Sequence, residues 1–265
     1  MIRYGLRTCA AVAALLLASA PTSAARQTAN PQSWRGTIAA GNVIEIKGVN
    51  GDIRAVAASG GEVEVSAVMK GNRSNPADVR LDIVQHAEGV TICAMYPSPD
   101  GRPNECQPGN GGRMNTRDND VRVDFTVRVP AGVRFTGRTV NGDVNAESLS
   151  GAVRISTVNG DANFSTSAYG EASSVNGSIH ATLGSTSWTD SLSFKSVNGS
   201  VNVDLPADAS TDIKVATVNG RISTAFPITV SGRVQPQRLN GTIGAGGRSL
   251  DIETVNGSIT LRKGQ

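Results

Sequence analysis

Residues 153–164 read Val-Arg-Ile-Ser-Thr-Val-Asn-Gly-Asp-Ala-Asn-Phe, and the Val-Asn-Gly at their centre recurs along the chain. This tripeptide, or its variant Leu-Asn-Gly, occurs eight times, with its asparagine at Asn50, Asn141, Asn159, Asn176, Asn198, Asn219, Asn240 and Asn256. The last seven copies are 18, 17, 22, 21, 21 and 16 residues apart. A period near 20 residues is typical of repeat architectures. Because Asn-Gly readily adopts positive φ, each copy predicts a tight turn.

The residues on either side of each copy predict short β-strands. Val153 and Ile155 alternate with Arg154 and Ser156, which is the period of a half-buried strand. An apolar residue returns two positions after each glycine, at Val144, Ala162, Ile179, Val201, Ile222, Ile243 and Ile259. The residue two before the asparagine is a threonine or serine of inward parity in the copies from residue 139 onward, except at Arg238. We expect its hydroxyl to form a hydrogen bond at a crowded corner, and we expect irregular structure over 225–238, where Pro227 and Pro236 also lie.

Two all-β architectures fit this pattern. In an antiparallel β meander or sandwich, each Asn-Gly would be a hairpin turn. In a mostly parallel β-solenoid, each repeat is one coil and equivalent turns stack about 4.8 Å apart. The solenoid explains why one turn type recurs once per unit, so we predict it, with Gly177, Gly199 and Gly220 at positive φ and Gly257 near an open end. The predicted turn ladder comprises Asn141, Gly142, Asn159, Gly160, Asn176, Gly177, Asn198, Gly199, Asn219, Gly220, Asn240, Gly241, Asn256 and Gly257.

The N-terminus predicts export. Residues 1–24 combine Arg3 and Arg7 with a short apolar run and small residues, which is typical of a secretory signal peptide. We expect residues 25–35 to form a flexible leader and residues 36–265 a single β-repeat domain, without a transmembrane segment after cleavage. Without Arg3 and Arg7 the chain has 23 basic and 22 acidic residues, a net charge of +1. Together with 4% aromatic content and no basic run, this balance argues against a nucleic-acid partner.

Two cysteines remain after cleavage, Cys93 and Cys106. An even pair in an exported protein favours a disulfide, with two free thiols or a metal pair as alternatives. Cys106 lies in a segment at 96–120 that is rich in proline, glycine and asparagine. Loops of this length are uncommon in compact domains and are usually functional or disordered. Cys93 has outward parity on the preceding strand, so we expect it to tether the loop.

Catalytic chemistry has little support in the sequence. His180 alternates with Ile179 and Ala181 and is expected to face solvent, and His86 has no recognisable serine or cysteine partner. An acid follows Asn-Gly only at Asp52, Asp143 and Asp161, so a repeated calcium site is not expected; residues 118–120 (Asp-Asn-Asp) are a weak candidate for an isolated cation site. A polysaccharide-acting enzyme needs paired carboxylates, and the acids here are scattered singly. We therefore predict no enzyme activity, no cofactor, and no metal-binding or catalytic residues.

Two segments together resemble a known family. Residues 125–133 (Phe-Thr-Val-Arg-Val-Pro-Ala-Gly-Val), followed by residues 139–144 (Thr-Val-Asn-Gly-Asp-Val) and the serial repeats, are similar to the bacterial putative-adhesin family of exported β-strand-repeat proteins. The family domain has no assigned function, and the resemblance covers roughly residues 40–263. It implies a right-handed, mostly parallel β-solenoid at the cell envelope and implies no catalytic residues.

Taken together, these observations predict a non-catalytic, exported cell-envelope protein that acts as an adhesin or a binding scaffold. It would present a polar face and a tethered loop to a protein or glycan partner, in the periplasm or at the cell surface, or as a secreted protein. The alternatives are a β-helix enzyme acting on polysaccharide and an accessory protein of envelope stress or signalling.

Overall fold

The computed structural model describes residues 27–28, 32–230, 232 and 235–264. The predicted signal peptide, 1–24, lies outside these residues. The predicted leader lies partly inside them, and there the expectation of a flexible segment is wrong. Residues Gln32–Gly36 form a strand that pairs antiparallel with residues Val63–Gly71. The strand is held in place because Trp34 packs against the core and the side-chain oxygen of Gln32 accepts a hydrogen bond from the backbone N–H of Leu81.

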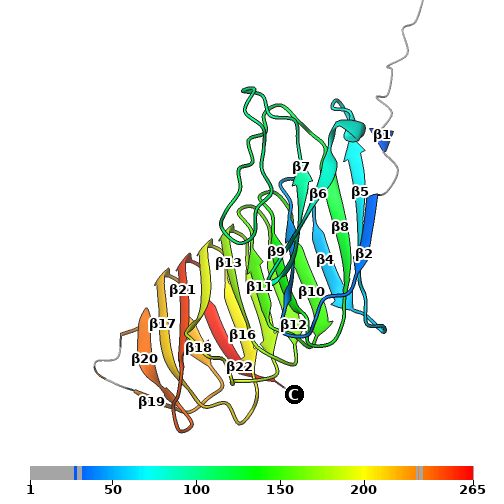
Figure 1. Cartoon of the computed structure of the whole chain (residues 1–265). Helices are drawn as coiled ribbons and strands as arrows, with labels where there is room; N and C mark the ends of the chain where they lie inside the picture. The colour runs from blue at the N-terminus through cyan, green and yellow to red at the C-terminus, as the bar shows by residue number, and fades with distance from the viewer. Residues whose placement is uncertain (1–26, 29–31, 231, 233–234, 265) are drawn as a thin grey trace, which may run out of the picture.

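The fold consists of two sheets of eleven strands each, shown in Figure 1. The segment before β6 contains a 3-10 turn, η1 (Pro76–Asp78). Sheet A contains β1 (Gln27–Thr28), β2 (Gln32–Gly36), β4 (Ile53–Ala57), β5 (Val63–Gly71), β8 (Arg122–Val129), β10 (Val144–Leu149), β12 (Ala162–Thr166), β14 (Ile179–Leu183), β16 (Val201–Leu205), β18 (Ile222–Thr224) and β22 (Ile259–Lys263). Sheet B contains β3 (Val43–Lys47), β6 (Arg80–His86), β7 (Gly89–Met95), β9 (Arg134–Arg138), β11 (Val153–Ser156), β13 (Gly170–Asn176), β15 (Leu192–Asn198), β17 (Thr211–Asn219), β19 (Ile228–Val230), β20 (Arg238–Ile243) and β21 (Ser249–Asn256).

The repeats form a parallel β-solenoid, as the sequence predicts. Each coil contributes one strand to each sheet, turns at Val-Asn-Gly, and pairs in parallel with its neighbours, for example β12 with β10 and β14. The antiparallel meander is therefore wrong for the repeats. Antiparallel pairs occur at the ends of the stack, where β5 pairs with β8, β6 with β7, and β20 with β17. Valine, isoleucine and phenylalanine side chains fill the space between the sheets, and the rings of Phe164 and Phe194 stack 6.2 Å apart.

The last coil does not follow the chain order. β21 lies between β15 and β17, and β22 lies between β16 and β18, so the C-terminal coil separates two coils that are consecutive in sequence. Gly257 is therefore inside the stack, and the expectation that it lies near an open end is wrong. The Asn240 copy is a second exception. It belongs to β20, pairs antiparallel with Lys214, and does not join the ladder. Irregular structure was expected over residues 225–238; among the described residues of this range, bends and turns occur, but residues Ile228–Val230 form the regular strand β19.

Two rows of hydrogen bonds hold the coils together at the Val-Asn-Gly corner. Each ladder asparagine donates from Nδ2 to Oδ1 of the preceding one at 2.8 Å, in the stacking order 50, 141, 159, 176, 198, 256, 219. In every ladder copy after Asn50, the buried hydroxyl two residues before the asparagine donates to a glycine carbonyl of the neighbouring coil; Thr157 bonds Gly142 at 2.9 Å and Thr254 bonds Gly199 at 2.8 Å. The predicted inward hydroxyl thus supports the corner.

The glycines of the ladder are needed for a different reason than predicted. Gly177, Gly199 and Gly220 do not have positive φ, so that expectation is wrong. A Cβ at these positions would lie 1.9 to 2.0 Å from the carbonyl oxygen of the glycine in the adjacent coil. Such a contact is impossible, and the contacting atom is backbone, which cannot rotate away. Glycine is therefore required because two backbones approach closely.

Candidate functional site

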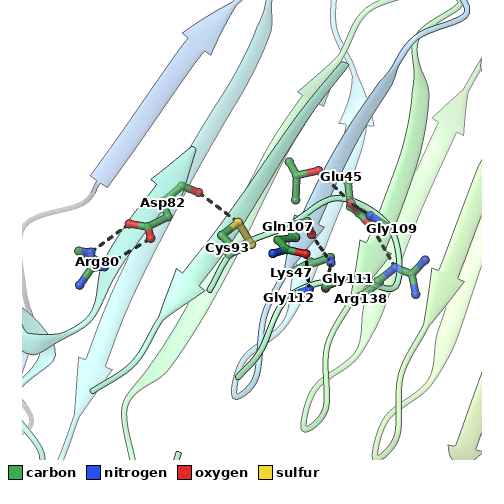
Figure 2. Close-up of a disulfide and its surroundings, with 12 residues drawn as sticks. Glu45, Lys47, Arg80, Asp82, Cys93, Gln107, Gly109, Gly111, Gly112 and Arg138 are labelled. Atoms are coloured by element: carbon green, nitrogen blue, oxygen red, sulfur yellow. Dashed lines mark hydrogen bonds and ion pairs between the residues drawn. A yellow bond between two sulfur atoms is a disulfide. The ribbon is translucent and has the colours of Figure 1, made fainter. Parts of the chain in front are cut away.

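The long loop at 96–120 is an ordered structure that covers the outer face of sheet B. A disulfide joins Cys93 on β7 to Cys106 in the loop, with 5.8 Å between their Cα atoms (Figure 2). Cys93 has the outward parity that the sequence predicts, yet it is only 2% exposed because the loop lies over it. Within the loop, the backbones of Glu105 and Arg113 exchange two hydrogen bonds of 2.8 and 3.0 Å. The loop is thus tethered by a covalent bond and braced internally.

Three charged side chains from sheet B hold the tip of this loop (Figure 2). Lys47 donates from Nζ to the carbonyl oxygens of Gln107 at 2.5 Å and Gly111 at 3.0 Å. The amide of Gly109 donates to Oε2 of the buried Glu45 at 2.9 Å. The Nε of Arg138 donates to Oε1 of Glu45, also at 2.9 Å.

The charged groups that hold the loop are one buried carboxylate, Glu45, and two half-buried cations, Lys47 and Arg138. Burial lowers the pKa of Lys47, the neighbouring Glu45 carboxylate opposes that shift, and Arg138 adds to it. Sequence reasoning missed all three residues because they lie on β3 and β9, far from the loop in the chain. Their only sequence signal is a charge at an outward strand position, which is ordinary for a solvated face.

A hollow of about 710 Å³ lies beside the loop tip. Pro108 and Gly109 form one wall and residues 188–192 form the other. Its floor is the outer face of sheet B, with Arg134 and Arg138 from β9, Arg154 from β11 and Tyr169 before β13 among the lining residues. Arg154 forms an ion pair with Glu171 on the neighbouring strand. The site therefore offers mixed charge, one phenol and an open floor.

A second hollow, of about 800 Å³, adjoins the first along the same strands. Arg154 lines the first hollow and Ser156 the second, two residues further along the outward side of β11. One edge of the second hollow is a stripe of stacked valines that precede the ladder asparagines: Val158, Val175, Val197, Val255 and Val218. Gln235, Gln237 and Arg238 also line it. Together the two hollows form a groove across sheet B, hereafter the sheet-B groove.

Two buried polar side chains beside the groove, Glu45 and Thr91, have hydrogen-bond partners, whereas Nε1 of the buried Trp188 has none among the described residues. The hydroxyl of Thr91 donates to Oε2 of Glu45 at 2.9 Å, and Nε2 of His86 lies 3.2 Å from the same hydroxyl. Thr91 is thus a partner of His86 that the sequence did not reveal. Its side chain is fully buried and its proton is committed to Glu45, so no substrate can reach it as a nucleophile. Glu45 accepts hydrogen bonds on both oxygens, which assigns it a structural role.

The other groups considered from the sequence lie outside this groove. His180 is exposed on sheet A, with Nε2 3.4 Å from Asp204. Asp52, Asp143 and Asp161 follow the ladder turn, and each accepts from the backbone N–H of the next coil at 2.8 to 3.0 Å. Within the described residues no group of three or more histidine, cysteine or acidic side chains is placed to hold a metal ion. In the same residues no helix is long and apolar enough to cross a bilayer.

Asp120, from the Asp-Asn-Asp segment, has a structural function at the base of the loop. Its carboxylate accepts from the backbone N–H groups of Asn72, Arg73 and Ser74, the last at 2.8 Å. These bonds, the one from Ser74 foremost, lower the pKa of Asp120 to about 2. The site therefore joins residues 72–74 to the end of the long loop.

The stability that the Asp120 carboxylate contributes should depend on pH. Because the folded pKa of Asp120 lies below its unfolded value, its stabilisation is present above about pH 4 and is lost as pH falls toward 2. We expect Asp120→Asn to lower the urea midpoint at pH 7 and to leave it nearly unchanged at pH 2. Parallel urea titrations of the two proteins check this; a difference that is constant across the pH range would contradict it.

The comparisons with known proteins agree with this geometry. A family model described as Toastrack DUF4097 matches residues 42–262. The chain belongs to the Toastrack DUF4097 family. No curated protein matches it. This Toastrack chain is similar to the structure of a putative cell adhesion protein from Clostridium sporogenes, at 10% identity and a TM-score of 0.50, over 89% of this chain and 100% of that one.

A further match is the structure of a putative adhesin from Bacteroides fragilis. It is 12% identical, with a TM-score of 0.38, over 88% of this chain and 97% of that one. A putative adhesin from Parabacteroides merdae is also 12% identical, with a TM-score of 0.26, over 89% and 96% of the two chains. At such identities the likeness concerns the fold alone.

Proposed function

We propose that this Toastrack protein is a non-catalytic binding scaffold of the cell envelope that holds a partner in the sheet-B groove. The observation that carries the proposal is the anchoring of the loop wall. A disulfide, the buried Glu45 and the half-buried Lys47 and Arg138 fix a 25-residue loop beside an open floor. A wall fixed in this way keeps its shape before a partner arrives, which lowers the entropic cost of binding.

The chemistry of the groove suits an extended polar partner, either a peptide or a glycan. Arg134 is exposed on the floor and has no ion pair among the described residues. Tyr169 adds a half-buried ring, and the valine stripe adds apolar surface along one edge. The hydrogen bonds of Glu45 and Thr91 commit both groups to the structure, which supports binding over turnover.

Substitutions in the groove test this proposal. The mature chain, residues 25–265, would be immobilised and exposed to envelope extract, alongside the double variant Arg134→Glu/Tyr169→Ala and the control His180→Ala. His180 is exposed on the other sheet, so the control should retain the same component as the unaltered protein. The double variant should retain at least about tenfold less of this component, because removing central contacts of an interface usually has an effect of this size. Equal retention by all three proteins would place the partner elsewhere.

Export is part of the proposal, and it has its own measurement. Cleavage of residues 1–24 should give a mature chain that begins near Ala25 in the envelope fraction. N-terminal sequencing of the protein from fractionated cells would check this. A chain that keeps its N-terminus and stays in the cytoplasmic fraction would contradict it, and would also remove the oxidising setting expected for the disulfide.

A further inference from the structure

Among the described residues, one strand edge, that of β18 at the far end of sheet A, has no neighbouring strand. β18 is the last strand of sheet A and pairs with β22 on one side alone. Sheet B continues past the same coil by two strands, β20 and then β19. The opposite end of sheet A differs, because β8, β5 and β2 follow β4 in turn. At this end of the stack, sheet B therefore extends two strands beyond sheet A.

The backbone of this edge is open to a further strand. Ile259 donates its N–H to the carbonyl of Arg221 at 2.8 Å, and Gly257 donates to Asn219 at 3.1 Å, so these carbonyls face β22. Successive residues of a parallel strand point their N–H and C=O groups to opposite sides. The groups of Gly220, Ile222 and Thr224 consequently face away from β22, where the described chain has no strand to pair with them.

Apolar surface is exposed along the same edge. The residues stacked below Ile222 are fully buried, whereas Ile222 itself is half-buried: Val144, Ala162, Ile179, Val201 and Ile259 are each 0% exposed. Val218 is 62% exposed, against 38 to 40% for its equivalents Val140, Val158, Val175, Val197 and Val255. Ile228 on β19 and Leu239 on β20 are also half-buried. The edge lacks the apolar cover that a further strand provides to every other coil.

The charge around this edge is positive. Arg221 stands where the other ladder coils carry aspartate or serine, and Arg262 and Lys263 end the neighbouring β22. All three are exposed, and none forms an ion pair within the described residues. Lys263 lies 5.5 Å from the ring centroid of Phe226. Asp204 pairs in register with Arg262, but its carboxylate lies toward His180. A second copy of this chain would bring the same positive charges and be repelled.

We propose that the β18 edge binds an extended, acidic segment of a partner protein by strand addition. The segment would pair with the outward backbone groups of Gly220, Ile222 and Thr224, as strands add to exposed sheet edges. Its alternate apolar side chains would cover Ile222, and its acidic side chains would face Arg221 and Arg262. This site is separate from the sheet-B groove, so either one can fail without the other.

The test uses two blocked, labelled heptapeptides and the full mature protein. One is Asp-Val-Glu-Val-Asp-Val-Glu, and the other has lysine in place of every acid. Fluorescence anisotropy should show binding of the acidic peptide that weakens with salt, and at least about tenfold weaker binding of the basic one, because complementary charge selects the partner. An acidic peptide with N-methyl groups on alternate amides keeps the charge but cannot add as a strand, and should not bind.

Variants locate the site. Arg221→Glu/Arg262→Glu should reduce binding of the acidic peptide about tenfold or more, and Arg102→Glu, an exposed arginine on the long loop, should leave it unchanged. Hydrogen exchange should slow at the amides of Gly220, Ile222 and Thr224 when the acidic peptide is bound. Equal affinity for the basic or N-methylated peptide would overturn the proposal. The proposal would also be overturned if the same amides were protected without peptide and light scattering showed that the protein self-associates.

Discussion

Ile259→Ala should remove about 4 kcal/mol of unfolding free energy, and Ile222→Ala only about 2 kcal/mol, within the range for large-to-small core substitutions. The two isoleucines occupy equivalent places, two residues after the ladder glycine. Ile259 lies between Val201 and Ile222 and is fully buried, whereas Ile222 has Ile259 on one side and, within the described chain, no strand on the other. The alanine cavity is therefore enclosed at 259 and partly open at 222.

Urea unfolding of the two variants and the unaltered protein measures these losses. The comparison is matched in residue type and in repeat position, so that only the place in the stack differs. If the coils were stacked in chain order, residue 222 would be interior and residue 259 terminal. The larger loss would then occur at Ile222, and that reversal would contradict the intercalated order.

Gly199→Ala, a single methyl addition inside the ladder, is expected to cost about 3 kcal/mol or more of unfolding free energy. Its Cβ would lie 2.0 Å from the carbonyl oxygen of Gly177 and 2.4 Å from the carbonyl carbon. Overpacking typically costs about 1–3 kcal/mol when side chains can move, and here the obstacle is backbone. The two coils would have to separate, which also breaks the asparagine bond between Asn198 and Asn176.

Two controls separate close approach from backbone conformation. Gly61→Ala adds the same methyl where nothing lies within 4 Å, and should be neutral. Gly199→Asn should be as damaging as Gly199→Ala, because asparagine tolerates positive φ but still carries a Cβ. Thermal unfolding of the three variants checks the set. A mild effect of asparagine at 199 would restore the positive-φ explanation.

Local sequence patterns predicted much of the fold. Alternation around residues 153–156 and the return of an apolar residue after each glycine identify strands and their inward faces. The inward parity of Thr157 and its equivalents predicted the buried hydroxyl. Parity also placed Cys93 on the outer face, where the loop reaches it. These inferences succeed because each depends on neighbours within a few residues.

The remaining features depend on contacts between distant segments. Every ladder coil has the same Asn-Gly corner, so the sequence does not indicate the order in which the coils stack. The position of the coil at residues 249–263, between two coils that are consecutive in sequence, was therefore not predicted. For the same reason the sequence does not show why residue 199 must be glycine, because the constraint comes from the backbone of the adjacent coil. Lys47 and Glu45 lie 60 to 64 residues before the loop residues that they hold, and Arg138 lies 93 residues after Glu45, so this anchoring leaves no local signal.

The order of the coils is the central claim, and paired cysteines test it most directly. Lys195 and Glu253 are exposed and lie in register on adjacent strands, whereas Ala216 is one strand further away, in register with Glu253. A short thiol-specific cross-linker should join Lys195→Cys to Glu253→Cys rapidly in the folded protein and should fail with Lys195→Cys and Ala216→Cys. Efficient cross-linking of 195 to 216, with none between 195 and 253, would show that the coils stack in chain order and would contradict this structure.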